Sequence, residues 1–550
     1  MSKKILSLLL VLAMVFVFAA CQPTTSTSPS DDAGTESPAT EPSEDGEDAT
    51  EPTDPATTGD AYELTYMMYS TTASDQDAVV EAAINEYIQP LINATIDFIM
   101  IPAGDWKEKV LTPLQSGEKM DIIFTPEWVY YMDNISKGLL LALDDPEGKY
   151  GDLMNTYAPE AVENLGAFIS ANRVNGHLYG FATKKELCVP GGLMWNADYV
   201  EKYNIDITTV ETFADMEQYL KMFVEDPDND GVYPLLSTGG WTHESPFIQG
   251  FVSNVEPVTM RMGNPGEEQV PESYWEAPET KAFCQTMEKF YQAGYLHPDS
   301  YLTSFSNMDY LNAGNFMVST DYVLKGGQVK ANELMAQSGN SELRLVEYQT
   351  HKNNSSGNTS VNVTTHAGGS MLGIPVTSQN PVAAMQYINL MHMDTTVLNL
   401  MAWGVEGVHY NLTEDGYAAP IDNNGWNNAH GGMWTIGDQF KQIISASEDP
   451  AKYEQMLALT AEAWNHCSLG FRFVPDAVAS EITAMTTVSD SYSRSMRTGV
   501  GVTDNYDSFV QQLYDAGLQT VLDAITEQYN AWKAENPTDP GAAWEVSVNE

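Results

Sequence analysis

The first part of the folded region alternates between strand-like and helix-like segments. Short runs over 62–69, 94–101 and 121–124 have the apolar composition of buried strands. Between them, residues 75–88 place apolar side chains at helical spacing, and a second helix is expected over 104–117. A strand–helix–strand–helix–strand order predicts a parallel α/β sheet, because parallel neighbours are joined by a crossover that is usually a helix. This alternation constrains the fold more than any other feature of the chain.

The rest of the chain continues this pattern and ends in helices. Ligands of open α/β sheets bind beyond the carboxyl ends of strands. We therefore expect functional residues just after strands, in 70–72, 102–104 and 125–128. Further expected elements are a strand and an asparagine-started helix in 191–205, an amphipathic helix over 212–225, strands at 233–241, 316–322 and 368–375, a helix over 381–393, and a mostly helical C-terminal region.

Residues 1–20 have the pattern of a secretory signal peptide. A basic start precedes an apolar run, and two small residues precede Cys21. The stretch FAAC resembles the bacterial lipoprotein signal, although the usual first residue is leucine. The resemblance implies lipid attachment to the Cys21 thiol and cleavage before it. The alternative is an ordinary secretion signal with an accidental cysteine.

The segment that follows Cys21 is polar and acidic. Residues 22–61 contain no Lys, Arg, aromatic or large aliphatic residue. They cannot bury enough apolar surface to offset the entropy of ordering, so we expect 21–61 to be a lipidated cysteine followed by a disordered linker. Repelling acids and prolines would keep such a linker extended.

The charge of the chain restricts its partners. With 76 acidic and 25 basic residues, the formal net charge is −51. Nucleic acid is an unsuitable partner, because binding it needs clustered Lys and Arg. Anionic ligands are also disfavoured, although a local basic pocket can override the mean field. The alternative is that the charge serves only to keep an exposed protein soluble.

The cysteines other than Cys21 indicate neither a metal site nor a disulfide framework. Cys188, Cys284 and Cys467 match no metal-binding spacing and cannot all pair with one another. Cys284 shares a predicted helical face with apolar side chains, so we expect it to be a small buried hydrophobic residue.

Several segments, taken in order, resemble one protein family. Residues 79–125 resemble the first lobe of extracellular solute-binding proteins of ABC importers, most closely the large lipoproteins of the carbohydrate-importer class. NGHLYGFAT resembles their crossover into the second lobe, and LMWNADYVEKYNI resembles the strand and helix that follow. MLGIPVTSQNPVAAMQYINLM resembles the return crossover, and WGVEGVHYNL resembles a signature of the long-form members.

The resemblance implies a type II periplasmic-binding-protein-like fold with two α/β lobes, crossing hinge segments and a helical C-terminal region. One lobe would span 62–185 plus about 370–425, and the other about 186–369 plus 426–550. The lobes would close on a ligand, most readily an oligosaccharide or other carbohydrate, and deliver it to ABC permease subunits. The chain would act as a monomer outside the cytoplasm, held to the cell membrane by its lipid, and would require no cofactor.

A carbohydrate cleft needs exposed aromatic rings and polar side chains near strand ends, because sugars combine apolar C–H faces with polar edges. The aromatic candidates are Trp128, Trp241 and Trp403. The polar candidates are Glu127, Lys184, Glu186, Asp321 and Glu406. Glu406 has an alternative role, which is to hold its own loop through backbone N–H groups.

The stretch DPDNDGVY has the start of a calcium loop. Asp226, Asp228, Asp230 and the Val232 carbonyl provide oxygen ligands at alternate positions. The twelfth position of the pattern is Ser237 instead of Glu. A weak structural Ca²⁺ site and a plain Asp/Asn/Gly turn both remain open at this point.

Other function classes have weaker support. The histidines show no metal-type pairing, and the chain contains neither a Gly-x-Ser-x-Gly motif nor a phosphate loop. Paired carboxylates could build a secreted glycan-active enzyme, but so many acids guarantee chance pairs. A peptide or another small solute is the stronger alternative ligand, although the sequence marks no charged anchor for a peptide terminus.

Overall fold

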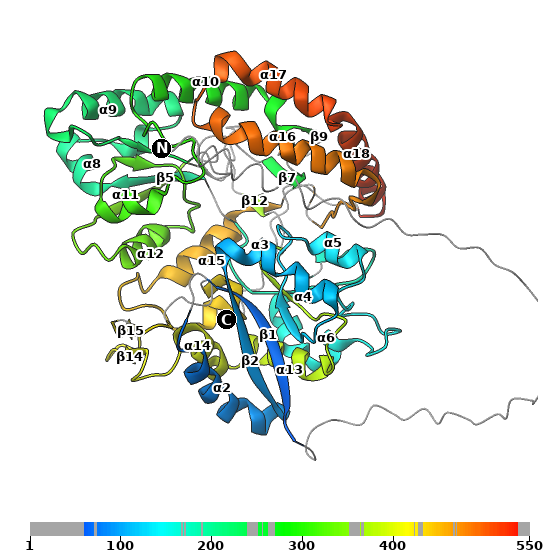
Figure 1. The fold of residues 1–550 in the computed structure, drawn as a ribbon. Helices are drawn as coiled ribbons and strands as arrows, with labels where there is room; N and C mark the ends of the chain where they lie inside the picture. Colours follow the sequence, from blue (N-terminus) through cyan, green and yellow to red (C-terminus); the bar gives the residue numbers. More distant parts are fainter. Residues whose placement is uncertain are drawn as a thin grey trace, which may run out of the picture. The chain divides into compact units, whose positions relative to one another are not determined.

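The computed structural model describes residues 60–70, 74–166, 169, 172–188, 191–238, 251–255, 257–261, 270–350, 363–364, 368–422, 424–426, 433–465, 468 and 470–536 (Figure 1). The predicted signal peptide, Cys21, the linker up to residue 59, Trp241 and Cys467 lie outside these residues.

The first sheet has five strands in the order β2-β1-β3-β13-β4. β1 is parallel to both β2 and β3, which confirms the predicted parallel arrangement. β13 is antiparallel to β3 and to β4, so β4 runs in the same direction as β3. The strands are β1 (Tyr62–Ser70), β2 (Ala94–Pro102), β3 (Ile122–Phe124), β4 (Phe181–Ala182) and β13 (Met371–Gly373).

The helices of the first α/β segment begin and end differently from the prediction. α2 (Asp77–Ile92) starts two residues late, because the Ser74 hydroxyl accepts from the N–H of Gln76 outside the helix. The second expected helix divides into α3 (Trp106–Lys109) and α4 (Leu111–Ser116). Pro113 explains the break, since it has no N–H to donate to the Lys109 carbonyl.

A hydrophobic cluster, here the first core, surrounds this sheet. Its buried side chains come from two separate stretches of sequence, 64–182 and 371–436. α13 packs against α6, α7 and α14 on this core. The helices are α5 (Tyr131–Ser136), α6 (Leu153–Tyr157), α7 (Pro159–Leu165), α13 (Pro381–Met393) and α14 (Thr395–Trp403), with a hairpin of β14 (Tyr410–Leu412) and β15 (Ala418–Pro420) beyond them.

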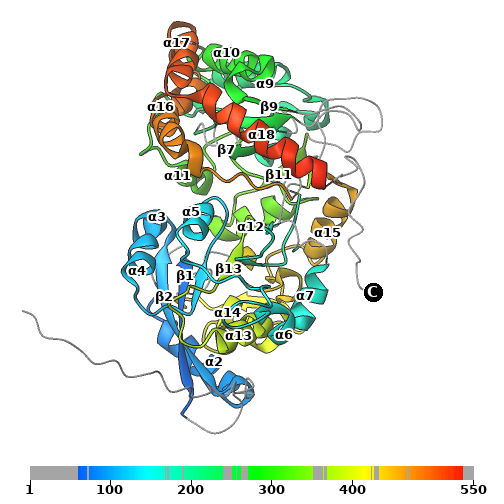
Figure 2. The same ribbon diagram turned by 90° about the vertical axis from the view of Figure 1, so that its right-hand side faces the viewer.

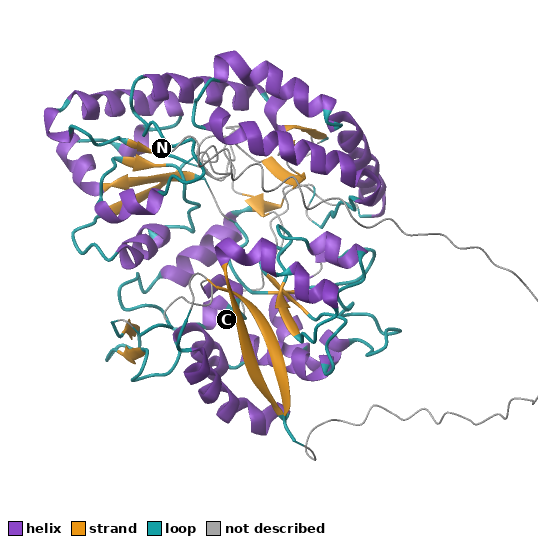
Figure 3. Ribbon diagram, in the orientation of Figure 1, coloured by secondary structure: helices purple, strands orange, loops and turns teal. Residues whose placement is uncertain are grey.

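A second sheet has the strand order β11-β5-β10-β6, and β10 is parallel to β6 (Figure 3). Among the described residues of the predicted strands at 233–241 and 316–322, two in each strand pair in the ladder, and the Thr238 N–H donates to the Asp321 carboxylate instead of a strand carbonyl. The strands are β5 (Gly192–Asn196), β6 (Leu235–Leu236), β10 (Val318–Ser319) and β11 (Leu345–Gln349).

The helices beside the second sheet follow local capping signals. Asn196 caps α8 (Ala197–Tyr203) by accepting from the Asp198 N–H, as predicted. Thr212 and Asp215 form a capping box at the start of α9 (Phe213–Glu225). The other helices here are α10 (Pro278–Gln292), α11 (Asn307–Ala313) and α12 (Val329–Ser338).

The C-terminal region is helical, as predicted. α16 (Ala479–Arg497), α17 (Val502–Asp515) and α18 (Leu518–Glu535) pack against one another, and α18 contacts β9 (Figure 2). β9 (Pro271–Ser273) forms a small sheet with β7 (Phe251–Val255) and β8 (Val258–Arg261). These elements share a second hydrophobic cluster, here the second core, with side chains from 193 to 529; Cys284 is buried in it, as expected.

Segments that pass between the two cores lie side by side. The Lys184 N–H donates to the Gly437 carbonyl, and the Gln439 N–H donates to the Lys184 carbonyl. Two further segments pair through β12 (Val363–Thr364) and β16 (Trp464–Asn465), and α15 (Lys452–Glu462) precedes β16. In the part of the chain that the structure describes, none of the helices combines the length and apolarity needed to cross a bilayer.

Candidate ligand-binding site

Aromatic side chains gather where β1 and β3 of the first sheet end. Tyr69 and Phe124 have ring centroids 5.3 Å apart, and both contact Trp106, which is buried. The ring centroid of Tyr69 lies 5.9 Å from that of Trp128 and 6.2 Å from that of Trp434. We call Tyr69, Trp106, Phe124, Trp128 and Trp434 the aromatic cluster.

Trp128 is the exposed member of the aromatic cluster. Its side chain is 45% exposed, and its indole N–H donates to the Gly369 carbonyl at 2.8 Å. Edge contacts with Tyr69 and Phe124 fix the orientation of the ring. Because the polar atom is already paired, the accessible part of Trp128 is apolar ring surface, which suits stacking against another apolar face.

Glu127, the residue before Trp128, pairs with a cation from the second core. Arg472 Nη2 lies 3.3 Å from Glu127 Oε2 and donates to Asn172 Oδ1 at 2.8 Å. Phe471 and Phe473, on either side of Arg472, are buried in the second core. This ion pair therefore joins the two cores beside the aromatic cluster.

Asp321 lies at the carboxyl end of β10 in the second sheet. It is partly buried, and its carboxylate accepts from the N–H of Thr238, which follows the parallel strand β6. Burial raises the pKa of Asp321 to about 7, although the Thr238 hydrogen bonds and Arg494 oppose the shift. Asp321 is thus held at the strand-end edge where the sequence predicts ligand groups.

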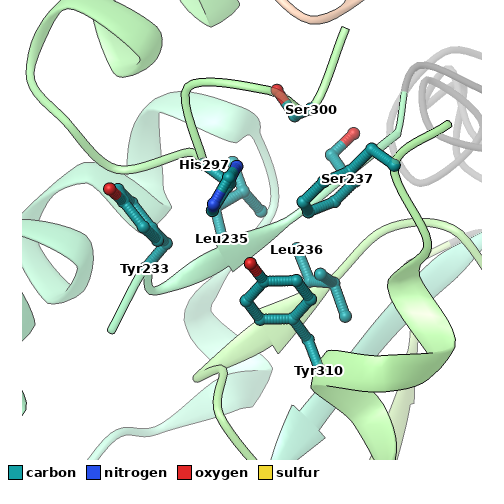
Figure 4. A pocket seen from close by; sticks show the side chains of 8 residues that line it. Tyr233, Leu235, Leu236, Ser237, His297, Ser300 and Tyr310 are labelled. Carbon is teal, nitrogen blue, oxygen red and sulfur yellow. The ribbon is translucent and has the colours of Figure 1, made fainter. Parts of the chain in front are cut away.

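A narrow cavity with room for about one water molecule lies behind this strand end (Figure 4). In Figure 4, the His297 ring lies between Tyr233 and Ser237, and Tyr310 lies below it. The lining residues are Tyr233, Leu235, Leu236, Ser237, His297, Ser300, Phe305 and Tyr310.

Lys184 and Glu186 lie on a segment that crosses between the cores. Lys184 donates to Asn164 Oδ1 at 2.7 Å and lies 3.9 Å from Asp438 Oδ2. Glu186 is only 4% exposed and accepts from Gln439 Nε2 at 2.5 Å. Burial alone would raise the pKa of Glu186, but Lys185, Lys325 and the Gln439 hydrogen bond outweigh it and lower the pKa to about 2.

Glu186 belongs to a chain of buried charges, here the crossing network. Lys325 Nζ lies 3.8 Å from Glu186 Oε1 and 3.2 Å from Glu333 Oε1. Lys452 Nζ lies 3.0 Å from both Glu333 and Glu448. The network links the crossing segment to α12 and to the start of α15, so its position supports a structural role for Glu186.

The other sequence candidates lie elsewhere. Trp403 is 4% exposed and packs in the first core, where its indole N–H donates to the Ile443 carbonyl at 2.8 Å. Glu406 is exposed in the loop after α14, where the Val405 N–H donates to His409 Nδ1 and the Gly407 N–H donates to the Tyr410 carbonyl. Neither residue lies in the aromatic cluster.

The calcium-type loop is held by a cation of the protein itself. Asp226 accepts from Tyr203 at 2.8 Å and lies 2.9 Å from Lys202 Nζ, which lowers the pKa of Asp226 to about 2. Asp226 also accepts from the Asp228 N–H, as in an Asx turn. The described residues contain no group of three or more His, Cys, Asp or Glu side chains that could hold a metal ion. The described geometry is that of the Asp/Asn/Gly turn, and a Ca²⁺ site in this loop stays a prediction.

Sequence reasoning missed Tyr69 and Arg472. Tyr69 lies inside a predicted strand, one residue before the predicted functional positions at 70–72. Arg472 lies between two phenylalanines that anchor in the second core, and this alternation is the signal that could have identified it.

The chain belongs to a family of binding proteins. Residues 70–391 match the family described as bacterial extracellular solute-binding protein, and residues 467–534 match a domain of unknown function, DUF3502. The chain is therefore a bacterial extracellular solute-binding protein.

Two curated relatives cover most of the chain. A carbohydrate ABC transporter substrate-binding protein of Streptococcus pneumoniae is 26% identical over 465 residues, which is 82% of this chain and 87% of the relative. The polygalacturonan/rhamnogalacturonan-binding protein YtcQ of Bacillus subtilis is 23% identical over 421 residues, which is 75% of each chain.

Solved structures confirm the predicted two-lobed type II fold. The N-glycan transport solute-binding protein NgtS of Streptococcus pneumoniae has a TM-score of 0.72 and 21% identity, covering 87% of this chain and all of NgtS. NgtS has also been solved in complex with Man1GlcNAc and with Man5GlcNAc, at TM-scores of 0.69 and 0.67.

We predict that Glu186→Gln destabilises the protein by about 3–5 kcal/mol at pH 7, because it leaves buried cations of the crossing network undercompensated. The folded pKa of Glu186 is lowered, so its contribution is present above the unfolded pKa of about 4.3 and is lost as the pH falls towards 2. The gap in unfolding free energy between wild type and variant should therefore shrink from pH 7 to pH 3 in denaturant titrations.

The matched control for this prediction is Glu201→Gln, which removes a carboxylate from an exposed pair with Arg344. Its unfolding curve should stay close to that of wild type, since surface ion pairs contribute little. Equal behaviour of the two variants would contradict the role assigned to Glu186.

A second prediction concerns Asp321→Asn, which keeps an oxygen to accept from Thr238 but cannot ionise. The folded pKa of Asp321 is raised, so ionisation makes the wild type lose stability as the pH rises from about 4 to about 7. The free energy of unfolding of the variant, relative to that of wild type, should therefore rise by up to about 4 kcal/mol over this pH range. Parallel stability curves between pH 4.5 and pH 8 would refute the shift.

Proposed function

We propose that this chain captures an oligosaccharide or other carbohydrate outside the cytoplasm and delivers it to the membrane subunits of an ABC importer. The observation that carries the proposal is Trp128, whose exposed ring surface lies at the strand-end edge of the first sheet. An indole face complements the C–H face of a sugar, and nearby carboxylates can accept from its hydroxyls. The relatives that bind or transport carbohydrates support the same conclusion.

The ligand would bridge groups from both cores. On the first core, Trp128, Tyr69 and Trp434 would form the stacking surface, and Glu127 would accept from hydroxyls. On the second core, Asp321 is a candidate acceptor. Trp241, predicted from its place after a strand, remains a candidate. Trp403 and Glu186 are assigned structural roles, because the protein itself occupies their polar groups.

Binding would shift the protein towards a closed state. A ligand that touches both lobes stabilises the closed arrangement by its differential affinity for it. The paired segments around Lys184 and Gln439 are candidates for the hinge, since few residues need to change their dihedral angles.

The proposed lobes are those expected from the sequence, with one adjustment. The first would hold 62–185 and about 370–425, and the second about 186–369 and 426–550. Because Trp426 and Ile436 are buried in the first core, we place the final crossing after residue 436.

The proposed anchor is a lipid on Cys21. An apolar segment with a small-residue exit before Cys21, and a polar linker over 22–61, support a tethered receptor. We propose that the protein acts as a monomer beside its permease.

Thermal unfolding of the purified protein against oligosaccharides, monosaccharides and short peptides tests the proposed function. A ligand at a hundred times its dissociation constant should stabilise by about 2.7 kcal/mol. A shift with a glycan supports the proposal. A rise in unfolding temperature with peptides alone, or no rise with any of the compounds, would contradict the proposal.

We predict that Trp128→Ala weakens glycan binding by at least about tenfold, because it removes the stacking surface. Its unfolding free energy should fall by about 1–2 kcal/mol, since only the buried half of the side chain contributes to packing against Tyr69 and Phe124. Calorimetry and denaturant titration measure the two effects. The control is Trp403→Phe, which removes a buried indole N–H and should cost stability while binding stays within about threefold. If Trp403→Phe weakened glycan binding and Trp128→Ala left it unchanged, the assignment of the site to Trp128 would be contradicted.

We also predict that Cys21→Ala releases the protein from the membrane, because the lipid on this cysteine is the proposed attachment. Fractionation of expressing cells into membrane and medium measures this. Retention of the variant on the membrane would rule out the lipid anchor.

A further inference from the structure

The structure brings one arginine of the second core to the ligand side of the first core. Phe471 contacts Tyr529 and Trp532 of α18, and Phe473 is buried with them, so the backbone at 471–473 belongs to the second core. The Arg472 side chain nevertheless reaches Glu127 and Asn172. The Arg472 side chain is only 11% exposed, and the Glu127 side chain is 23% exposed.

This ion pair lies directly beside Trp128. The Glu127 N–H donates to the Gly368 carbonyl at 2.9 Å, and the Trp128 indole donates to the next carbonyl, that of Gly369, at 2.8 Å. A Cβ on Gly368 would lie 2.6 Å from Glu127 Oε2 and 3.1 Å from Arg472 Nη2. The glycine thus makes room for the pair, and a ring stacked on Trp128 would lie next to it.

A guanidinium is the group with which proteins hold a carboxylate most specifically, through parallel hydrogen bonds. In this site a protein carboxylate, Glu127, already takes that place. The other cations described at the strand-end edges are engaged as well. Lys184 faces Asp438 and Asn164, and Arg494 donates to the Ser300 carbonyl and lies near Asp321.

An acidic sugar would have to displace Glu127 from Arg472. That exchange would leave the partly buried Glu127 carboxylate without its cation and would bring two negative charges together. A neutral sugar requires no such exchange, because its hydroxyls can donate to Glu127 while the pair stays intact.

We infer that Glu127 is a specificity residue: by neutralising Arg472 it makes the cleft select neutral oligosaccharides and exclude those that carry uronic acids. This inference rests on the proposed function, since it names the class of carbohydrate that the same site accepts. Glu127 disfavours an acidic ligand by occupying Arg472. It contacts a neutral ligand directly, as a hydrogen-bond acceptor.

The test compares neutral and uronate-containing oligosaccharides on the full-length protein in detergent. A glycan array that holds both classes is screened first, and calorimetry at fixed salt then gives the ratio of acidic to neutral affinity. Wild type should bind neutral glycans only. Glu127→Gln frees the Arg472 guanidinium, so the ratio should rise by at least about tenfold in favour of acidic glycans. The double variant Glu127→Gln/Arg472→Gln should lose this gain.

Glu201→Gln is the matched control, because it removes the same charge from a surface pair and must leave the ratio unchanged. Wild type that prefers acidic glycans, or a ratio that Glu127→Gln leaves unchanged, would overturn the inference while the carbohydrate function stands. If no glycan binds to either protein, the proposed function fails and the inference fails with it.

Discussion

The crossing network is the constraint on which the rest of the molecule depends. Burying an isolated charge is expensive, and a buried charge persists only where its partners and hydrogen bonds are in place. Glu186, Lys325, Glu333 and Lys452 come from distant parts of the chain and meet only if the segments around Glu186 and Lys452 take their present course. The need to pair these buried charges therefore constrains the path of the chain between the two cores. The cores themselves are separate apolar clusters.

The ligand site follows from strand direction within this frame. β1, β3 and β4 run in the same direction, so the residues that follow them share one edge of the first sheet. β13 runs the other way, and its leading residues Gly368 and Gly369 reach the same edge. The glycine carbonyls hold Glu127 and Trp128 in place, and Tyr69 and Phe124 support the indole from below. A stacking surface and a paired carboxylate result from the same few backbone positions.

The sequence predicts the parts of the molecule that depend on local patterns. The parallel strands, α8 with its asparagine cap, and α13 follow from periodicity and capping residues that lie close together in the chain. Trp128 is predicted correctly as a strand-end residue with an exposed ring, because its position depends on β3 alone.

The features that sequence reasoning could not assign depend on distant partners. Trp403 also precedes a loop, but Ile443 and the first core cover it, and nothing near Trp403 in the sequence indicates this. Glu186 lies at a predicted crossover, yet its environment is set by Lys325 and Gln439. Arg472 has its partner Glu127 in the other core, so only the folded chain brings the two together.

The most direct measurement of this account is a crystal structure of the protein with a bound glycan that has been found to stabilise it. The account predicts a sugar ring stacked on Trp128 at about 4 Å, hydroxyls on Glu127, and an intact Glu127–Arg472 pair. A glycan bound away from the aromatic cluster, with Trp128 still exposed to solvent, would contradict it.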